Sequence, residues 1–209
     1  LWYEKKYGDN IPEAEAGWWN DGWMYRKAIT VSNSSGGALT DFQVKILDNK
    51  DLSADITAGK IQSDLDDLRF TDINGTVLPY WIEDNTAASV DVWVKMPSIP
   101  TTGATVYFYY GNAQAGNEQN GNNVFEFFDD FSGATIDTGL VSYGGGTITQ
   151  NDYLTVVNNA DAWDEYVYTN QTFAREKIFY AKVKADQGAR TMVGWHDSGM
   201  GVGYGDQVY

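Results

Sequence analysis

Acidic side chains that lie beside aromatic residues are the first feature of this sequence that could carry chemistry. They are Glu83 and Asp84 after Trp81, Glu126, Asp129 and Asp130 among phenylalanines, and Asp164 and Glu165 after Trp163. Glycoside hydrolysis requires two carboxylates that face each other across a cleft. None of these acids has the close E-x-D-x-x-E spacing that places two carboxylates on one strand face. Because the chain holds 29 acidic residues, some must lie near tryptophan by chance, and a glycosidase is the weakest interpretation.

The sequence supports nucleophilic catalysis even less than it supports glycoside hydrolysis. A catalytic triad needs a base, usually histidine, beside its nucleophile. The only histidine is His196, in the segment GWHDSG, and no G-x-S-x-G motif accompanies it. There is no cysteine, which excludes disulfides, thiolate catalysis and cysteine-based zinc sites. The sequence therefore predicts a protein that is not an enzyme.

Two groups of neighbouring acids could contribute to a cation site. They are Asp64, Asp66 and Asp67 in one segment, and Asp129 and Asp130 in another. Ca²⁺ takes about six to eight oxygen ligands, often from loops. Solvated acidic loops are the commoner explanation, and no EF-hand spacing is present. For Ca²⁺, the only cofactor that the residues suggest, Asp129 and Asp130 are the better pair, because Phe128 and Phe131 would hold them rigidly.

Tryptophans and sequons suggest a possible role for sugars. Trp93 alternates with apolar residues that we expect to be buried, so its ring should point outward, where it could contact a sugar. Trp163 and Trp195 are the other carbohydrate-binding candidates. Since tryptophan more often packs inside a fold, packing is favoured over sugar binding. The three N-x-[ST] sequons, at Asn33, Asn74 and Asn170, all fall in expected loops and are candidate glycosylation sites.

The elements that must position these residues are β-strands. Val90, Val92, Val94 and Met96 are apolar at every second position, which predicts a strand with one buried face. Proline cannot donate to a β-ladder, so Pro97 and Pro100 should end this strand. Asn74-Gly75 predicts a tight hairpin turn, after which the chain should return as a strand over Val77 to Glu83. Further strands are expected over Trp23 to Val31, around Phe42, Val44 and Ile46, at Val106 to Tyr110, and at Tyr153 to Val157, Trp163 to Tyr168, Ile178 to Lys184 and Thr191 to Trp195.

Composition divides the chain into four parts. We expect an aromatic N-terminal arm over 1–22, a first β-sandwich over 23–112, a linker over 113–123 and a second sandwich over 124–209. The linker is rich in Gly, Asn and Gln and has no apolar period. The arm should dock on its own domain, with a neighbouring copy as the less favoured alternative. The second part offers about five strands, fewer than a jelly roll uses, so it is incomplete unless the chain continues or another copy adds strands.

Charge narrows the range of partners. A formal net charge of -15 argues against nucleic acid, which binds basic surfaces. It also argues against adhesion to anionic membranes, and no apolar run has the length of a bilayer span. The chain begins with Leu rather than Met, so we expect that a signal peptide has been removed or that this is a fragment.

Six short motifs together resemble one known family. They are WMYRK from Trp23, DFQV from Asp41, LRFTD from Leu68, LPYWIE from Leu78, VWVKMP from Val92 and VYFYYGN from Val106. In this order they resemble the domain of unknown function 2341, over roughly Trp23 to Gly133. The resemblance implies an exported protein whose next domain is often a concanavalin-like, or laminin-G-like, sandwich, and Phe127 to Gly133 looks like the start of one. It implies no activity.

The sequence therefore predicts an all-β chain of two β-sandwich units in series, of jelly-roll or Ig-like type, with the second incomplete. The expected role is a non-enzymatic structural or adhesion module, extracellular or at the cell surface, with a self-assembling filament or surface-layer subunit as one form. Its partners would be copies of itself or other surface proteins. The alternative is a carbohydrate-binding, lectin-like module of a larger extracellular protein, with glycans as ligands. Neither nucleic acid nor membrane insertion is expected.

Overall fold

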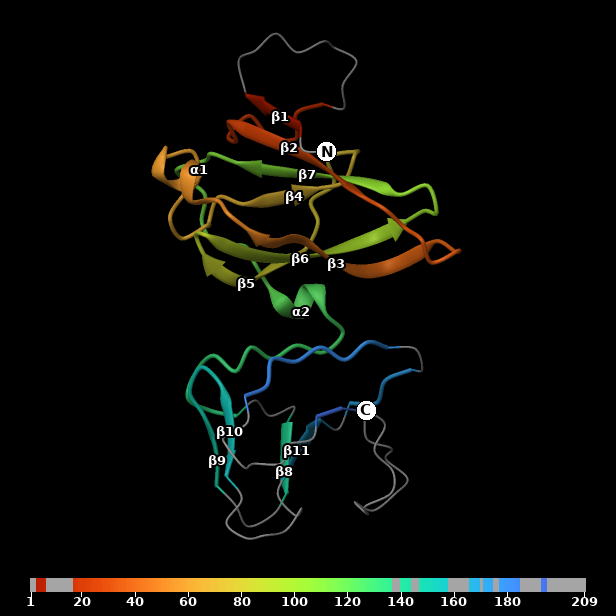
Figure 1. The fold of residues 1–209 in the computed structure, drawn as a ribbon, viewed down its shortest axis with the longest axis vertical. Coiled ribbons are helices and arrows are strands. Elements are labelled where there is room, and N and C mark those ends of the chain that lie inside the picture. Colours follow the sequence, from red (N-terminus) through yellow and green to blue (C-terminus); the bar gives the residue numbers. More distant parts are fainter. Residues whose placement is uncertain are drawn as a thin grey trace. The chain divides into compact units, whose positions relative to one another are not determined.

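The fold is all-β, as the sequence predicts, and divides into two compact units, Leu1–Asp130 and Phe131–Tyr209 (Figure 1). The computed structural model describes residues 3–6, 17–136, 140–143, 147–157, 166–169, 171–174, 177–184 and 193–194. Within these residues every paired strand is antiparallel, and the helices are short.

The first unit is a sandwich of two sheets (Figure 1). The first sheet has the order β1 (Tyr3–Lys6), β2 (Tyr25–Val31), β7 (Ala104–Tyr110), β4 (Arg69–Thr71). The second sheet has the order β3 (Leu39–Lys50), β6 (Ser89–Ile99), β5 (Tyr80–Thr86). Two short helices complete this unit, α1 (Ser53–Thr57) and α2 (Gly121–Val124).

The core lies between the two sheets and follows the period-two pattern. Val90, Val92 and Val94 of β6 are fully buried, as are Phe108 and Phe70 from β7 and β4. The rings of Phe70 and Phe108 stack with centroids 5.3 Å apart. Burying each such side chain contributes roughly 1.5–3 kcal/mol, so these alternating residues supply much of the driving force for the sandwich.

The predicted turn at Asn74-Gly75 forms, but the chain leaves it differently from the prediction. Gly75 has φ +83°, a conformation that glycine adopts without strain, and its N–H donates to the Asp72 carbonyl. The return is then a single bridge between Thr71 and Val77. After Pro79 the chain crosses to the second sheet as β5, so the expected strand from Val77 to Glu83 is divided between the two layers.

β6 also runs further than expected, through Pro97 to Ile99. Pairing with β5 extends along β6 only to Val94, which lies opposite Tyr80. Beyond that point β6 has β3 alone as a strand neighbour, so the missing N–H of proline interrupts no central ladder. The prediction that Pro97 ends the strand is therefore wrong, whereas Pro100 directly follows its last residue, as predicted.

Residues 113–123, the predicted linker, pack against the first unit and cover the outer edge of β5. The Ile82 N–H donates to Gln119 Oε1 at 2.8 Å, and the Asn120 N–H donates to the Tyr80 carbonyl at 2.9 Å. A side-chain amide and a backbone N–H of this segment thus pair with backbone groups of β5 that would otherwise be unpaired at the sheet edge. The boundary between the units falls after Asp130 rather than at this polar segment.

The described part of the N-terminal arm docks on its own unit. β1 pairs with β2, with Tyr3 opposite Ala28. Trp18 and Trp19 contact Tyr109, with ring centroids 5.4 and 5.6 Å apart. This is the arrangement that the sequence favours over docking on a neighbouring copy.

The described residues of the second unit form two small sheets, β8 (Leu140–Tyr143) with β11 (Tyr166–Thr169) and β9 (Thr147–Gln150) with β10 (Leu154–Val157). β10 corresponds to the strand predicted at Tyr153 to Val157, and β11 overlaps the one predicted up to Tyr168. The strand predicted over Ile178 to Lys184 is not formed, and 177–184 is irregular. Ile178 there is 83% exposed, so its alternating pattern has no sheet to join among the described residues.

Candidate functional site

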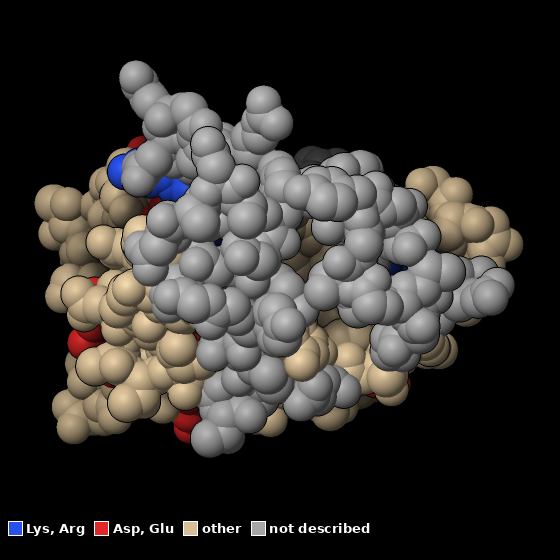
Figure 2. Space-filling view, turned by 90° about the horizontal axis from the view of Figure 1, so that it is seen from below, with Lys and Arg blue, Asp and Glu red and all other residues tan. Residues whose placement is uncertain are grey.

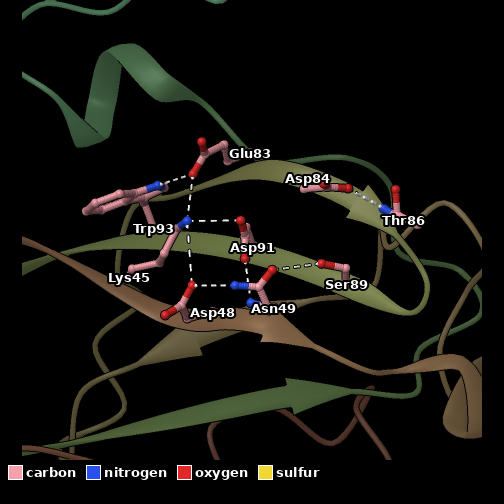
Figure 3. Close-up of polar contacts among 9 residues, drawn as sticks. All are labelled: Lys45, Asp48, Asn49, Glu83, Asp84, Thr86, Ser89, Asp91 and Trp93. Carbon is pink, nitrogen blue, oxygen red and sulfur yellow. Dashed lines mark hydrogen bonds and ion pairs between the residues drawn. The ribbon is translucent and has the colours of Figure 1, made fainter. Parts of the chain in front are cut away.

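A buried ionic cluster lies on the outer face of the second sheet of the first unit. We call Lys45, Glu83, Asp91 and Trp93 the Lys45 cluster (Figure 3). Lys45 comes from β3, Glu83 from β5, and Asp91 and Trp93 from the central strand β6. Since the valines that flank Asp91 and Trp93 point into the core, the pleat directs these two side chains to the opposite face.

Irregular pairing on both edge strands directs the other two members toward the centre. The register of β3 on β6 shifts between Lys45 and Leu47, and that of β5 on β6 shifts between Ile82 and Asp84. The second shift places Glu83 at a β-bulge. A bulge bends its strand and changes the direction of its side chains. Lys45 and Glu83 therefore come from opposite edges of the sheet and meet over the middle strand, where Lys45 also contacts Asp91.

The contacts within the Lys45 cluster are short and sheltered. Lys45 Nζ lies 2.9 Å from Asp91 Oδ2 and 3.1 Å from Glu83 Oε2. The Trp93 indole N–H donates to the same Glu83 oxygen at 2.8 Å. The Asn49 backbone N–H donates to Asp91 Oδ1 at 2.6 Å. The Glu83 side chain is only 3% exposed and that of Asp91 9%, whereas that of Lys45 is 21% exposed.

The electrostatics favour a charged amine in this setting. Burial alone would lower the pKa of Lys45, because it penalises the ammonium form. The hydrogen bonds and the attraction of Asp91 and Glu83 outweigh burial and raise the pKa of Lys45 above its ordinary value. Asp48 contributes a more distant charge, with Oδ1 at 3.8 Å. The cluster thus holds the Lys45 amine against the Asp91 carboxylate, and the Glu83 carboxylate contacts the same nitrogen.

Aromatic rings beside α2 cover the Lys45 cluster. Phe125 lies edge-on to Trp93, with ring centroids 5.6 Å apart, and Phe128 stacks on Phe125. Trp81 contacts Phe128 at 4.8 Å between centroids. A Cβ on Gly121 would lie 2.3 Å from the Phe128 ring, so only glycine lets this ring pack against the backbone of α2. We call these rings the aromatic cover of the cluster, which they contact through Trp93.

A second buried polar network lies in the segment where the sequence groups Asp64, Asp66 and Asp67. Asp67 is buried, in contrast to the expected solvated loop, and accepts hydrogen bonds from the backbone N–H groups of Gln62 and Gly111. Burial raises the pKa of Asp67, although these hydrogen bonds oppose the shift. The carboxylate therefore joins two loops of the fold. Asp64 also serves local geometry, because its Oδ1 accepts a hydrogen bond from the Asp66 backbone N–H.

The predicted Ca²⁺ pair, Asp129 and Asp130, ends the first unit. Among the described residues, no group of three or more His, Asp or Glu side chains is arranged to hold a metal ion. The structure thus adds no third acidic ligand to the pair from the part of the chain that it describes. Binding of Ca²⁺ at Asp129 and Asp130 stays a prediction.

The sugar-binding candidates have different outcomes. Trp93 is half-buried, with its N–H bonded to Glu83 and its ring packed on Phe125. In this structure its ring therefore serves packing. Trp163 and Trp195 lie outside the described residues, and so do Asn170 and His196. Carbohydrate binding stays a prediction for all three tryptophans.

Of the two described sequons, Asn74 is the more open to modification. It is exposed at the tip of its turn. The Asn33 side-chain nitrogen donates to the carbonyls of Gly37 and Ile99 at 2.8 and 2.7 Å. A glycan on Asn33 would replace one of the two N–H donors, since an amide nitrogen has only two. Glycosylation, if it occurs, should therefore favour Asn74.

On the face seen in Figure 2, the described residues present mainly uncharged side chains, with a few acidic and basic ones among them. Neither helix in the described residues has the length and apolarity that crossing a membrane requires.

Comparison with known proteins gives one finding. Residues 64–144 match the family described as Domain of unknown function (DUF2341), which confirms the predicted family over that segment. The segment includes β4 to β7, and with them Glu83, Asp91 and Trp93 of the Lys45 cluster. No curated protein and no solved structure matches the chain.

Sequence reasoning located Glu83 as an acid beside tryptophan but did not single out Lys45 or Asp91. A signal existed, because both occupy outward positions of strands whose inward residues are valines and leucines. What the sequence did not reveal is the pair of register shifts that brings them into contact.

Proposed function

Residues 64–144 belong to the DUF2341 family, whose function is unknown, and on this premise we propose that the chain is a non-enzymatic structural or adhesion module of an exported, cell-surface or extracellular protein. Its partners are copies of itself or other surface proteins, and a filament or surface-layer subunit is one form of this role.

The observation that carries the proposal is the closed state of the Lys45 cluster. A general acid or base must reach the proton that it transfers to or from a substrate. The Glu83 side chain is 3% exposed, and its Oε2 is already bonded to Lys45 and Trp93. Three strands are thus tied together by charges under aromatic cover. This arrangement suits a rigid structural face better than it suits turnover of a substrate.

The sheet edge at β3 supports association with other chains. β3 is a strand of twelve residues at the edge of its sheet, and among the described strands it pairs with β6 alone. An edge of this kind can accept a strand from another polypeptide. The register shifts of β3 interrupt its regular ladder, which makes pairing with an arbitrary strand less favourable. Only a strand that matches this irregular edge would then add to it.

Exposed apolar side chains in the second unit give a further reason to expect a partner. Ile178 is 83% exposed and Val183 54% exposed. Since both lie in the segment whose alternating pattern favours a strand, a pairing surface from another copy would bury them. On this proposal the second unit is a concanavalin-like sandwich that reaches its full sheet only in the assembled state.

The test is sedimentation velocity of the purified chain over a wide concentration range. We expect species larger than the monomer to increase with concentration. Ile178→Asp should reduce this association, whereas the matched change Ile73→Asp, at an exposed isoleucine of the first unit, should not. A chain that stays monomeric at every concentration would count against self-assembly, and reduced association in both variants would count against the second unit as its site.

The lectin-like alternative is favoured by exposed aromatic rings in the second unit. Tyr153 is 65% exposed and Tyr180 53% exposed. A glycan array would test this alternative: retention that is lost on changing Tyr153, Trp163 or Trp195 to alanine would support it. Retention that depends on added Ca²⁺ and on Asp129 and Asp130 would also support the predicted cation pair.

A further inference from the structure

The contact between Lys45 and Asp91 is an ion pair, and it also places an amine next to a carboxyl group with which it could react. The amine nitrogen of Lys45 lies 2.9 Å from Asp91 Oδ2, although the two residues are 46 positions apart in the sequence. They come from adjacent strands, β3 and β6, so folding alone brings them together. A third group, Glu83 Oε2, contacts the same nitrogen at 3.1 Å. Figure 3 shows the two acids converging on the amine from different sides.

We propose that Lys45 and Asp91 condense within the folded chain to form an intramolecular amide, an isopeptide bond, with Glu83 as the acid–base group. Lys45 Nζ attacks Asp91 Cγ, and the bond from Cγ to Oδ2 breaks. Of the three protons on the lysine ammonium, one stays on the amide nitrogen and two leave with Oδ2 as water. One positive and one negative charge disappear together, and no oxidant, reductant or other reactant is needed.

Glu83 is placed to move these protons. The attacking nitrogen must first lose its positive charge, and Glu83 Oε2 is hydrogen-bonded to that nitrogen. The proton can then pass to the departing oxygen of Asp91, Oδ2, which is itself 2.9 Å from the Lys45 nitrogen. The Trp93 N–H bond to Glu83 Oε2 fixes the position of this carboxylate during both transfers. Glu83 is unchanged at the end of the reaction.

The other carboxylate oxygen of Asp91, Oδ1, accepts a hydrogen bond that would also stabilise the tetrahedral intermediate of this reaction. Attack on Cγ places negative charge on Oδ1. The Asn49 backbone N–H donates to Oδ1 at 2.6 Å, so it would stabilise that charge as an oxyanion-hole donor does. This N–H is directed there by the irregular backbone of β3, where Asn49 has φ +49°.

Proton transfer from the amine is favoured by burial and opposed by the two carboxylates. An amine and a carboxyl group can exchange a proton along their hydrogen bond and become neutral together, which burial favours, whereas the charges of Asp91 and Glu83 favour the ammonium form of Lys45. The side chains of Glu83 and Asp91 are almost fully buried, and Phe125 packs against Trp93 of the same cluster. Proximity of the reacting groups in a fixed geometry supplies the remaining advantage.

The test is the intact mass of the purified full chain, measured under denaturing conditions. We expect a mass lower than the sequence mass by one water molecule. Trypsin should then fail to cleave after Lys45, and the peptide 28–50 should be found joined to the peptide 70–95. An intact mass equal to the sequence mass would overturn the proposal, and so would water loss without this linked pair of peptides. Neither outcome depends on any variant being folded, and neither depends on the proposed function.

Variants then separate the chemistry from the ion pair. Lys45→Arg keeps the positive charge but cannot form the amide, so its mass should equal its sequence mass. Lys27→Arg is the matched control, because Lys27 also contacts a carboxylate, Asp55 at 3.0 Å, and this variant should still lose water. Glu83→Gln should leave most of the chain uncondensed at times when the wild type is complete. Condensation of Glu83→Gln at the wild-type rate would overturn the role of Glu83, and water loss in Lys45→Arg would overturn the bond itself.

Discussion

Lys45 on β3 and Asp91 on β6 face each other on the outer surface of the second sheet, with 2.9 Å between Nζ and Oδ2. This contact joins an edge strand to the central strand at the point where the ladder between them loses its regular register. The contact between these two side chains thus links the strands where their backbone register is irregular.

Replacing Lys45 should destabilise the first unit strongly. Lys45→Met leaves the Asp91 and Glu83 carboxylates buried with neither a cation nor an amide partner, and leaving buried charges unpaired in this way costs about 3–5 kcal/mol. Urea unfolding monitored by tryptophan fluorescence measures the change. The matched control is Lys95→Met on the same sheet, where the lysine is half-buried and where we expect a change within about 0.5 kcal/mol. Equal effects of the two changes would contradict a stabilising role for the Lys45 cluster.

Gly121→Ala should displace the aromatic cover of the Lys45 cluster. The added methyl group would lie 2.3 Å from the Phe128 ring, which must move away from Trp81. Overpacking of this kind costs roughly 1–3 kcal/mol. Gly116→Ala is the control, since its Cβ would meet nothing within 4 Å. The expected readout is a change in tryptophan fluorescence and in the unfolding midpoint for Gly121→Ala alone, and an unchanged spectrum would show that the cover does not depend on this glycine.

Stability at acid pH should depend on Asp55, which ties α1 to β2. Burial opposes ionisation, but the hydrogen bonds and charges of Lys27 and Lys60 outweigh it and lower the pKa of Asp55 below its ordinary value. A carboxyl group whose pKa is lower in the folded state stabilises the fold above its unfolded pKa. That contribution is lost as the pH falls through the folded pKa.

Asp55→Asn should therefore reduce stability at neutral pH, by about 1 kcal/mol for a partly exposed pair. Its difference from the wild type should shrink below about pH 4, the ordinary pKa of aspartate. Thermal unfolding of both proteins over this pH range checks the expectation. A difference that is independent of pH would mean that Asp55 acts through packing rather than through charge.

Arg69 should control the order of the polar segment that follows β7. Its guanidinium donates to the carbonyls of Asp66 and Gly116, both at 2.8 Å, and its Nε lies 3.2 Å from Glu118. Lysine cannot reproduce this set of directed donors. Arg69→Lys should therefore speed hydrogen exchange over residues 111–120 more than elsewhere in the first unit. Uniform acceleration across the unit would indicate global destabilisation instead.

The sequence predicts the strands of the first unit well, because a buried face imposes a period of two. Val90, Val92 and Val94 are buried, and the Asn74-Gly75 turn forms. The same pattern does not show which sheet a strand joins, and the chain changes sheets after Pro79. The polar segment 113–123 has no apolar period, yet it packs, because its backbone and amides bond to the edge of β5.

The Lys45 cluster was only partly predictable. Glu83 stands out beside Trp81, but the contact between Lys45 and Asp91 depends on register. A shift in pairing by one residue would turn a side chain to the other face. The residue types give no signal for the register shifts next to Lys45 and Glu83. The contact between these charged side chains is therefore visible only in the structure.

Electron microscopy of the concentrated, purified chain tests the central claim most directly, namely that this chain is a structural module that associates with its own kind. We predict ordered assemblies whose length or extent grows with protein concentration. Single separate particles at every concentration, with no ordered contacts between them, would contradict the proposed function.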